Sequence, residues 1–237
     1  MQEPYLFVAD LASPPKDLLL DEEQSRHAIQ VLRMQMGDTV QLTDGKGHLC
    51  FARIMVHNKK ACQVRIERQT YVPPPEKKVR IAISLLKNPG RFEWFLEKAT
   101  EIGVSEILPL LCQRTTRTHV RGARMQQVVI SALIQSRQAW MPVLHEPLAF
   151  ARIGDAAKEN EYRWIAHCLP GQKQTPNVST SRSPSSSLIL IGPEGDFTEE
   201  EIALAEAAGF LPVSLGDSRL RTETAGIAAA ALMCIGS

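Results

Sequence analysis

The residue types best suited to chemistry lie in two loops near the carboxyl end of the chain. The first loop, Gly192–Gly195, has the sequence GPEG, and the second, Gly216–Glu223, has the sequence GDSRLRTE. Arginines can stabilise negative charge that develops on a substrate, and a glutamate can orient an arginine or stabilise a cation. Charged loops are more often simply solvated, so the position of these loops in the fold decides between the two interpretations.

Each loop follows an apolar run that is typical of a short buried strand, Leu188–Ile191 for the first and Leu211–Leu215 for the second. Thr198 and Glu201 have the spacing of a capping box, which predicts a helix between the two strands. Gly209 suits the end of that helix. Ligands of open α/β sheets bind beyond the carboxyl ends of the strands. We therefore expect both loops to border one ligand site.

The charge around the first loop indicates the charge of the expected ligand. Helix amino ends attract phosphate, but Glu194, Asp196 and the run Glu199–Glu201 make this one acidic. An acidic helix start favours a neutral or cationic ligand. The sequence contains neither a P-loop nor a G-x-S-x-G pattern, which counts against a hydrolase or nucleotide enzyme that uses the loop as an anion cradle.

Composition excludes several broad classes of protein. The 237 residues suffice for one large or two small domains, and 44% of them are hydrophobic. The net charge of +1 means that a nucleic-acid partner would need local basic patches. No apolar run is long enough for a membrane span, the acidic start MQEPYLF is not typical of a signal peptide, and the five cysteines form no C-x-x-C pair. We expect a cytoplasmic protein without metal or disulfides.

The chain divides into two predicted domains, 1–72 and 73–237, at the prolines Pro73–Pro75. Alternating apolar and polar residues in 39–66 predict short strands and a small β-barrel. After the prolines, strands alternate with helices, which is typical of a mostly parallel sheet covered by helices. The strands are predicted at 79–85, 107–111 and 162–168, the helices begin near Asn88 and before Met125, and the Ser/Pro/Thr-rich segment 175–187 is predicted to be a surface excursion.

Basic residues that could contact RNA occur in both predicted domains. The densest cluster contains Arg114, Arg117, Arg121 and Arg124, and an arginine cluster of this kind is either a solvated face or a phosphate-binding surface. His27 is separated from Arg33 by apolar residues, and a lone histidine in such a place is more often structural than a ligand.

Four motifs, in the same order, resemble the RsmE-like family of bacterial ribosomal RNA uridine-N3 methyltransferases, in the SPOUT superfamily. They are the pattern His27, Val31, Leu32, Arg33, Gly37 and Asp38, the segment EKATEIGV at Glu97–Val104, the segment IGPEGD at Ile191–Asp196, and the segment LGDSRLRTETA at Leu215–Ala225. The family has glycine at the position of Asp196 and arginine at that of Ser218. The resemblance covers nearly the whole chain.

This resemblance implies a fold, a cofactor and a reaction. The fold is an α/β one with an N-terminal PUA-like β-barrel and a SPOUT domain that ends in a trefoil knot, in a homodimer. S-adenosylmethionine is held by main-chain groups of three loops, and its cationic sulfonium suits the acidic loop. The cofactor-binding residues implied here are Leu169, Gly171, Gly192, Pro193, Glu194, Gly195, Leu215, Gly216, Leu220 and Thr224.

The reaction is direct methyl transfer to N3 of a uridine in small-subunit (16S) ribosomal RNA, free or in the assembled subunit. We expect Arg221 to stabilise charge on the base, and Glu223 to orient Arg221 or to stabilise the sulfonium. The RNA-binding residues are predicted to be His27, Arg33, Lys46, Arg114 and Arg117. The alternative is a non-catalytic factor for ribosomal RNA binding or assembly, which would bind RNA without the cofactor.

Overall fold

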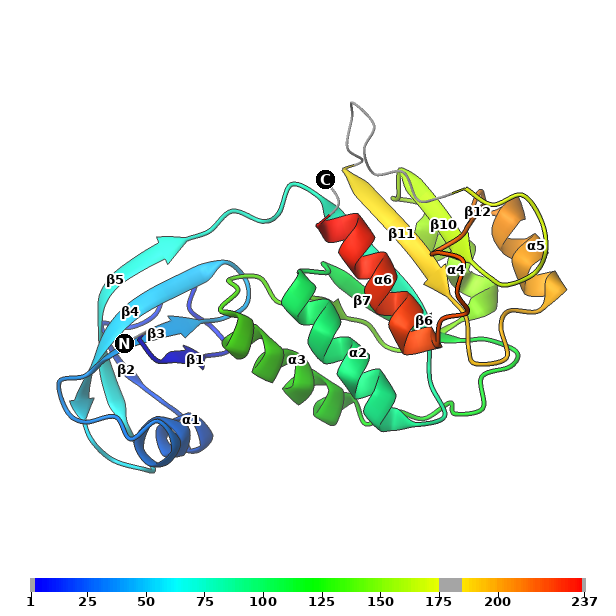
Figure 1. Ribbon diagram of the computed structural model, residues 1–237. Helices are drawn as coiled ribbons and strands as arrows, with labels where there is room; N and C mark the ends of the chain where they lie inside the picture. Colours follow the sequence, from blue (N-terminus) through cyan, green and yellow to red (C-terminus); the bar gives the residue numbers. More distant parts are fainter. Residues whose placement is uncertain (1–2, 175–184, 236–237) are drawn as a thin grey trace. The chain divides into compact units, whose positions relative to one another are not determined.

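The structure, a computed structural model, describes residues 3–174 and 185–235, so part of the Ser/Pro/Thr-rich segment lies outside the described residues. The chain forms two compact units (Figure 1). The first unit contains Met1–Pro74 and also Leu133–Met141, and the second contains Pro75–Ala132 and Pro142–Ser237. The expected division at residues 72 and 73 did not include the segment Leu133–Met141 in the first unit.

The first unit contains a five-stranded sheet in the order β1-β3-β4-β5-β2. Strand β1 pairs with β3 in parallel and the other pairs are antiparallel. The alternation in 39–66 correctly predicted the three central strands. Among the described residues β1 and β2 do not pair with each other, so the sheet is open and does not form the barrel that we expected. The alternation of residues indicates which face of a strand is buried, but it does not indicate whether the two edge strands pair. The strands are β1 (Tyr5–Phe7), β2 (Asp17–Leu19), β3 (Thr39–Thr43), β4 (His48–Val56) and β5 (Gln63–Tyr71).

A short helix packs beside this sheet. Helix α1 (Glu22–Arg26) begins with a capping box between Asp21 and Gln24, and continues as one π-helical turn, η1 (His27–Val31). Ala28 from this turn joins a core that includes Val40, Leu42 and Ile54 from the sheet. The turn ends at Val31, and Arg33, two residues later, adopts a left-handed conformation with φ 55°.

The segment Leu133–Met141 is joined to the first unit by hydrogen bonds. The indole Nε1 of Trp140 donates to the carbonyl of Val72 at 3.0 Å, and the hydroxyl of Tyr5 donates to the carbonyl of Gln138 at 2.9 Å. These bonds connect residues more than sixty positions apart in the sequence. Local patterns in the sequence therefore did not indicate that the segment belongs to this unit.

The second unit contains a seven-stranded parallel sheet in the order β12-β10-β11-β6-β7-β8, and β9 pairs with the far end of β7. The parallel sheet expected from alternating strands and helices is thus confirmed. The strands are β6 (Lys78–Ser84), β7 (Glu106–Leu111), β8 (Val143–Leu144), β9 (Leu148–Ala149), β10 (Tyr162–Ala166), β11 (Ser186–Ile191) and β12 (Leu211–Val213).

Helices cover both faces of this sheet. One face carries η2 (Phe150–Arg152), α4 (Ile153–Ala157) and α5 (Glu199–Ala207), whose apolar side chains pack on Ala82, Leu188 and Leu190. The other face carries α2 (Pro89–Ile102) and α6 (Thr222–Cys234), which lie side by side in Figure 1. Helix α3 (Gly122–Ser136) begins in this unit, and its residues from Leu133 onward belong to the first unit.

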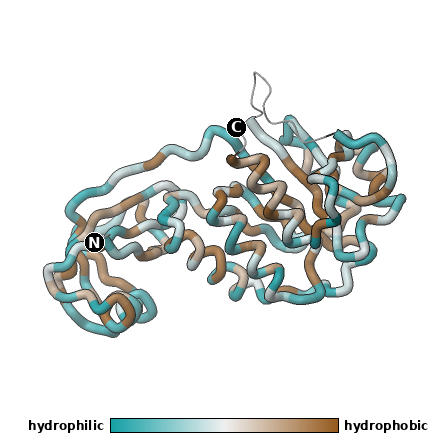
Figure 2. Tube along the Cα trace, viewed as in Figure 1, coloured by the Kyte–Doolittle hydropathy of each residue, from teal (hydrophilic) through white to brown (hydrophobic). Residues whose placement is uncertain are grey.

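Helix α6 is apolar along its length (Figure 2). It buries Gly226, Ala229 and Met233, but Leu232 and Ile235 are exposed. Gly226 lies so close to α2 that an added Cβ would be 2.7 Å from the ring of Phe95. The inner face of α6 is therefore fixed against α2 and the sheet, and its outer apolar face is uncovered. None of the described helices is both long and apolar enough to cross a membrane.

Capping residues correctly predicted two helix starts. The Thr198 hydroxyl accepts from the amide of Glu201 at 3.2 Å, and the Glu201 carboxylate accepts from the amide of Thr198 at 3.0 Å. Asn88 caps α2, and Gly103 ends it in a left-handed conformation. Several boundaries were wrong. Helix α6 begins at Thr222, before the expected Thr224. Strands β12 and β10 end at Val213 and Ala166, each two residues before the expected Leu215 and Cys168.

A buried carboxylate connects β7 to its neighbours and gives the unit a pH-dependent stability. Glu106 lies 2.5 Å from the ammonium of Lys78, 2.9 Å from Nε of Arg80 and 2.9 Å from Nε2 of His145. Burial raises the pKa of Glu106, but hydrogen bonds from Lys78 and His145 and the charge of Arg80 outweigh it, so the pKa is lowered. The ionised carboxylate therefore stabilises the fold above its ordinary pKa, and this contribution is lost as the pH falls through its lower folded value.

We expect Glu106→Gln to reduce the free energy of unfolding by about 3 kcal/mol at neutral pH, because it removes the buried carboxylate that is paired with the buried guanidinium of Arg80. Urea unfolding should show the difference from the unaltered protein shrinking as the pH falls below 4.5, the ordinary value for glutamate. The exposed Glu146→Gln serves as a control and should change little. A difference that stays constant from pH 7 to pH 3 would contradict the prediction.

Candidate functional site

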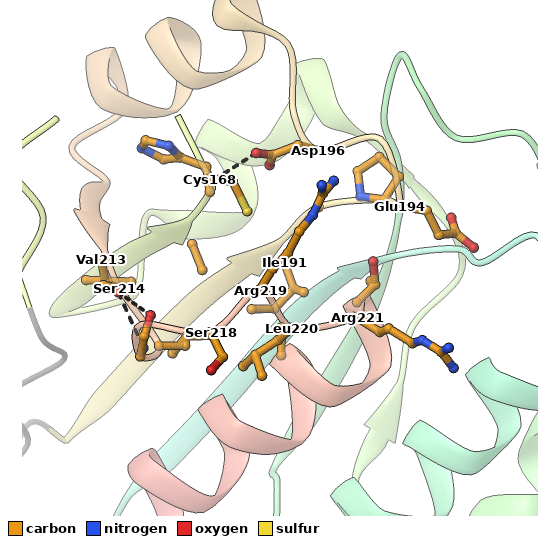
Figure 3. Close-up of a pocket in the computed structure, with 18 of the residues that line it drawn as sticks. Cys168, Ile191, Glu194, Asp196, Val213, Ser214, Ser218, Arg219, Leu220 and Arg221 are labelled. Atoms are coloured by element: carbon orange, nitrogen blue, oxygen red, sulfur yellow. Dashed lines mark hydrogen bonds between the residues drawn. The ribbon is translucent and has the colours of Figure 1, made fainter. Parts of the chain in front are cut away.

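A cavity of about 630 Å³ lies at the carboxyl ends of β10, β11 and β12 (Figure 3). Three segments provide most of its wall: Ala166–Cys168, Ile191–Asp196 without Gly195, and Val213–Thr222. Arg91, Lys173 and Ala225 complete it. The loops that follow β11 and β12 therefore border one cavity, as the sequence predicted, and a third loop after β10 joins them.

The turn after β11 allows the chain to pass close to its own backbone. A Cβ added at Gly192 would lie 3.2 Å from the backbone nitrogen of Phe197 and 3.1 Å from its ring. The carboxylate of Glu194 accepts a hydrogen bond from the amide of Lys87 at 3.2 Å. The turn is thus packed against Phe197 at Gly192 and bonded to Lys87 through Glu194.

Asp196 has a positive φ of 64°, a conformation that glycine adopts most easily. Its carboxylate accepts hydrogen bonds from the amide of Cys168 at 2.7 Å and from the amide of Phe197 at 2.8 Å. Aspartate tolerates this conformation better than most residues because its short side chain can bond to nearby backbone. The substitution of aspartate for the glycine of the motif therefore connects the turn to the loop after β10 (Figure 3).

Gly195 and Arg114 are paired outside the cavity. The guanidinium of Arg114 donates to the carbonyl of Gly195 at 2.6 Å, and a Cβ added at Gly195 would be 3.3 Å from the Arg114 side chain. Gly195 does not line the cavity. Arg114 therefore stabilises the turn on the side away from the cavity. The arginine cluster in the sequence did not indicate this structural role.

The loop after β12 brings two arginines to the cavity wall. Arg219 and Arg221 both line it, and their side chains point in different directions (Figure 3). Arg221 occupies the N-cap position of α6 but makes no capping hydrogen bond with its side chain. Its guanidinium is therefore not required to begin the helix.

Glu223 lies behind the wall. It is 7% exposed, its Oε1 is 3.7 Å from Nε of Arg91, and its Oε2 is buried without a hydrogen-bond partner among the described residues. Among the described residues, no hydrogen bond or ion pair joins it to Arg221, which we had expected it to orient. Its nearest cation is Arg91, from the first turn of α2.

His167 offers unused hydrogen-bonding groups at the cavity. Both ring nitrogens are buried and have no partner within the described ranges. Burial, and next the charge of Lys173, lower the pKa of His167, although Asp196 and Glu206 act in the opposite direction. The ring is therefore neutral at neutral pH and presents one donor and one acceptor. Buried polar groups without partners indicate a site that a polar ligand completes.

Some of the predicted cofactor-binding residues line the cavity, and others lie outside it. The cavity is lined by Gly192, Pro193, Glu194, Leu215, Gly216 and Leu220. Leu169, Gly171, Gly195 and Thr224 do not line it. Leu169 packs on the core and Thr224 is exposed on α6. The chain reaches the cavity with Ala166, the last residue of β10, and with the next two residues, His167 and Cys168. This follows the carboxyl-end rule more closely than our prediction did.

Sequence reasoning missed four polar residues of the wall, Arg91, His167, Lys173 and Ser214. His167 and Ser214 come directly after strands β10 and β12, so strand ends alone could have indicated them. Arg91 had no such signal, because its position depends on the packing of α2.

The predicted RNA-binding residues of the first unit do not form one cluster. Lys46 lies in the turn before β4, whereas Arg33 and Gly37 lie near its other end, where the amide of Gly37 donates to Ile54. Six residues of strand separate His48 from Ile54, or about 20 Å at 3.4 Å per residue. His27 is half-buried at the start of the π-helical turn. Within the described ranges no group of three or more acidic, cysteine or histidine residues could hold a metal ion.

Comparison with known proteins shows which family contains the residues of this cavity. Residues 73–234 match the RNA methyltransferase domain family, and residues 20–67 match the RNA methyltransferase PUA domain family. This chain belongs to the RNA methyltransferase family. The match to the methyltransferase domain includes all three segments of the cavity wall.

Several relatives resemble this RNA methyltransferase over most of its length. The ribosomal RNA small subunit methyltransferase E of Synechocystis is 33% identical over 87% of this chain and 69% of its own. A probable rRNA methyltransferase from Porphyromonas gingivalis has a TM-score of 0.88, with 34% identity over 98% of this chain and 99% of that one. The methyltransferase E of Neisseria gonorrhoeae, bound to S-adenosyl methionine, has a TM-score of 0.85, with 29% identity over 98% of this chain and 97% of its own.

Proposed function

We propose that this RNA methyltransferase transfers a methyl group from S-adenosylmethionine to N3 of a uridine in small-subunit (16S) ribosomal RNA. The observation that carries the proposal is the cavity of about 630 Å³, bordered by loops from three adjacent strand ends. The volume is within the range of about 300–1,000 Å³ usual for small-molecule sites. The gonococcal relative, of the same fold, holds this cofactor.

The residues present fit the cofactor. S-adenosylmethionine supplies a methyl group on a sulfonium cation, together with a carboxylate and an adenine. Glu194 and Asp196 place negative charge at the wall, and Arg91 and Arg219 place positive charge there. The free donor and acceptor of His167 suit a polar heterocycle. The main chain at Gly192, Leu215, Gly216 and Leu220 completes the proposed binding set.

Arg221 is the proposed catalytic residue of this site. N3 of uridine carries a proton at neutral pH, and its removal places negative charge on the neighbouring carbonyl oxygens. A guanidinium at the cavity wall can stabilise that charge. Glu223 acts through Arg91, which it holds against the cavity, and is therefore a positioning residue.

A trefoil knot in the second unit remains part of the proposal. The chain passes from β12, at one edge of the sheet, to α6, which packs on β6 and β11 in its middle. That route crosses the carboxyl ends of β10 and β11, beside the cavity. The match of residues 20–67 supports a PUA-like role for the first unit, whose sheet is open between β1 and β2 among the described residues.

Both units are proposed to bind the RNA in the cytoplasm, either as free ribosomal RNA or within the small ribosomal subunit. His27, Arg33 and Lys46 in the first unit and Arg117 in the second are the proposed contacts. Arg114 contributes by supporting the turn at Gly195. Basic side chains on RNA phosphates give affinity that decreases with salt.

We expect a homodimer that forms through the uncovered face of α6. Leu232 and Ile235 lie three residues apart on this helix, so they share one face, and Ile235 is 68% exposed. Light scattering at micromolar concentration should show a dimer, and Leu232→Lys with Ile235→Lys should convert it to a monomer. The double substitution Glu199→Lys and Glu200→Lys, on exposed positions of α5, is the control. A monomer before any substitution would refute the proposal.

The cofactor assignment is tested by calorimetry. Gly192→Val should weaken S-adenosylmethionine binding by at least about tenfold, or 1.4 kcal/mol, because the new side chain forces the turn away from Phe197. Gly122→Val is the matched control, since an added Cβ there meets nothing within 4 Å. Failure of the unaltered protein to bind the cofactor would favour the non-catalytic assembly factor instead.

A further inference from the structure

A second cavity, of about 370 Å³, lies in the second unit between the amino ends of α2 and α3. It shares no lining residue with the larger cavity. Its floor is apolar and well buried, and it is formed by Leu85, Leu86, Phe92 and Met125. Phe92 contributes an aromatic ring to this floor. A cavity with such a floor can hold a flat apolar group out of water.

The rim of this cavity is basic. Arg124 is paired with Glu93 at 2.9 Å, so these two charges offset each other. Among the described residues, Arg117 makes one side-chain hydrogen bond, in which Nε donates to the carbonyl of His119 at 3.0 Å. Arg121 makes no side-chain hydrogen bond or ion pair with the described residues. Two guanidinium groups at the rim, those of Arg117 and Arg121, are therefore available to an anionic partner.

An apolar floor beneath free guanidinium groups suits a nucleotide of single-stranded RNA. A base offers a flat face to aromatic and aliphatic side chains, and the phosphates on either side of it suit arginine. A surface that binds only the RNA backbone needs no apolar cavity. A purely apolar partner would leave the two guanidinium groups without counter-charge.

We propose that this second cavity binds the base of an unpaired ribosomal RNA nucleotide other than the one that is methylated, with its phosphates on Arg117 and Arg121. This proposal rests on the proposed function for the RNA substrate. The proposal adds a base-binding site to the proposed methyl-transfer site, and the residues of this second site do not line the cofactor cavity. Binding a second base would fix the register of the RNA strand on the enzyme.

Filling the cavity tests the proposal. Val120 is half-buried at the cavity wall, in the loop before α3, so Val120→Trp places an indole in the cavity without altering the rim charges. Binding of the full-length protein to fluorescent decauridylate should weaken by about tenfold, as expected for the loss of one stacked base. Binding to a ribose-phosphate oligomer of the same length without bases should stay within twofold. Val143→Trp, at an exposed valine elsewhere in the unit, is the matched control and should leave both unchanged.

The rim gives a second, independent variant. Arg121→Ala should weaken the binding of both oligomers and reduce the slope of log affinity against log salt by about 0.7, the contribution of one phosphate contact in single strands. Equal losses on the two oligomers in Val120→Trp, or no loss on decauridylate, would overturn the base-binding site. So would conversion of a dimer to a monomer by Val120→Trp, which would assign the cavity to a second copy of the chain.

Calorimetry with S-adenosylmethionine on the same proteins separates this proposal from the proposed function. Val120→Trp should bind the cofactor like the unaltered protein, since the two cavities share no lining residue. Absence of cofactor binding in the unaltered protein would reject the proposed function, whereas the comparison of the two oligomers would still decide the base-binding site.

Discussion

Arg221→Ala should lower methyl transfer to small ribosomal subunits by about 10²- to 10³-fold, the usual effect of removing one preorganised group that stabilises developing charge. Its affinity for S-adenosylmethionine should remain within threefold, because an interaction made mainly in the transition state contributes little to ground-state binding. The side chain makes no capping hydrogen bond, so α6 should begin as before. Incorporation of a labelled methyl group and calorimetry measure the two quantities.

The chain offers a matched control in Arg152. It is also an exposed arginine at a helix N-cap without a side-chain hydrogen bond, but it precedes α4 and does not line the cavity. Arg152→Ala should leave transfer unchanged. Turnover of Arg221→Ala within tenfold of the unaltered enzyme would reject the catalytic assignment, and a parallel loss of cofactor affinity would assign Arg221 to binding instead.

Gly226→Val should destabilise the second unit by about 3 kcal/mol, at the upper end of the usual cost of overpacking a core. Even a Cβ at this position would lie 2.7 Å from the ring of Phe95 and 2.9 Å from Cδ1 of Ile83. These two residues belong to α2 and β6, so α6 must move away from both. Because the loop that carries Arg221 leads directly into α6, the displacement should weaken cofactor binding as well.

Urea unfolding followed by circular dichroism measures this loss of stability. Gly122→Val makes the same chemical change at the exposed start of α3, where an added Cβ meets nothing within 4 Å, and should cost less than 1 kcal/mol. An equal cost at both positions would show that the loss does not come from the contact between α6 and α2.

Elements with local signals were predicted well. The capping box at Thr198 and the pair Asn88 and Gly103 located α5 and α2, because caps involve only neighbouring residues. The buried run before Ile191 located β11 for the same reason. The short strands β1 and β2 were missed, since three residues carry too little pattern to separate a strand from a loop.

The site was predicted at the level of loops and less well at the level of side chains. The carboxyl-end rule correctly placed the loops after β11 and β12 at one cavity. The pairings of Arg91 with Glu223 and of Arg114 with Gly195 join residues that are far apart in the sequence, and no local pattern encodes them. The resemblance to a family identified the chemistry, whereas the structure identified these partners.

The first unit is made of two segments that are far apart in the sequence, and this limits when it can finish folding during synthesis. Its sheet ends at Tyr71, but its remaining segment, Leu133–Met141, is translated some sixty residues later. The carbonyl of Val72 and the hydroxyl of Tyr5 therefore have no partners until Trp140 and Gln138 emerge, after more than half of the chain has been made. Domains usually fold as they leave the ribosome. Here the N-terminal sheet can complete its contacts only after β6, α2 and β7 of the second unit have also emerged.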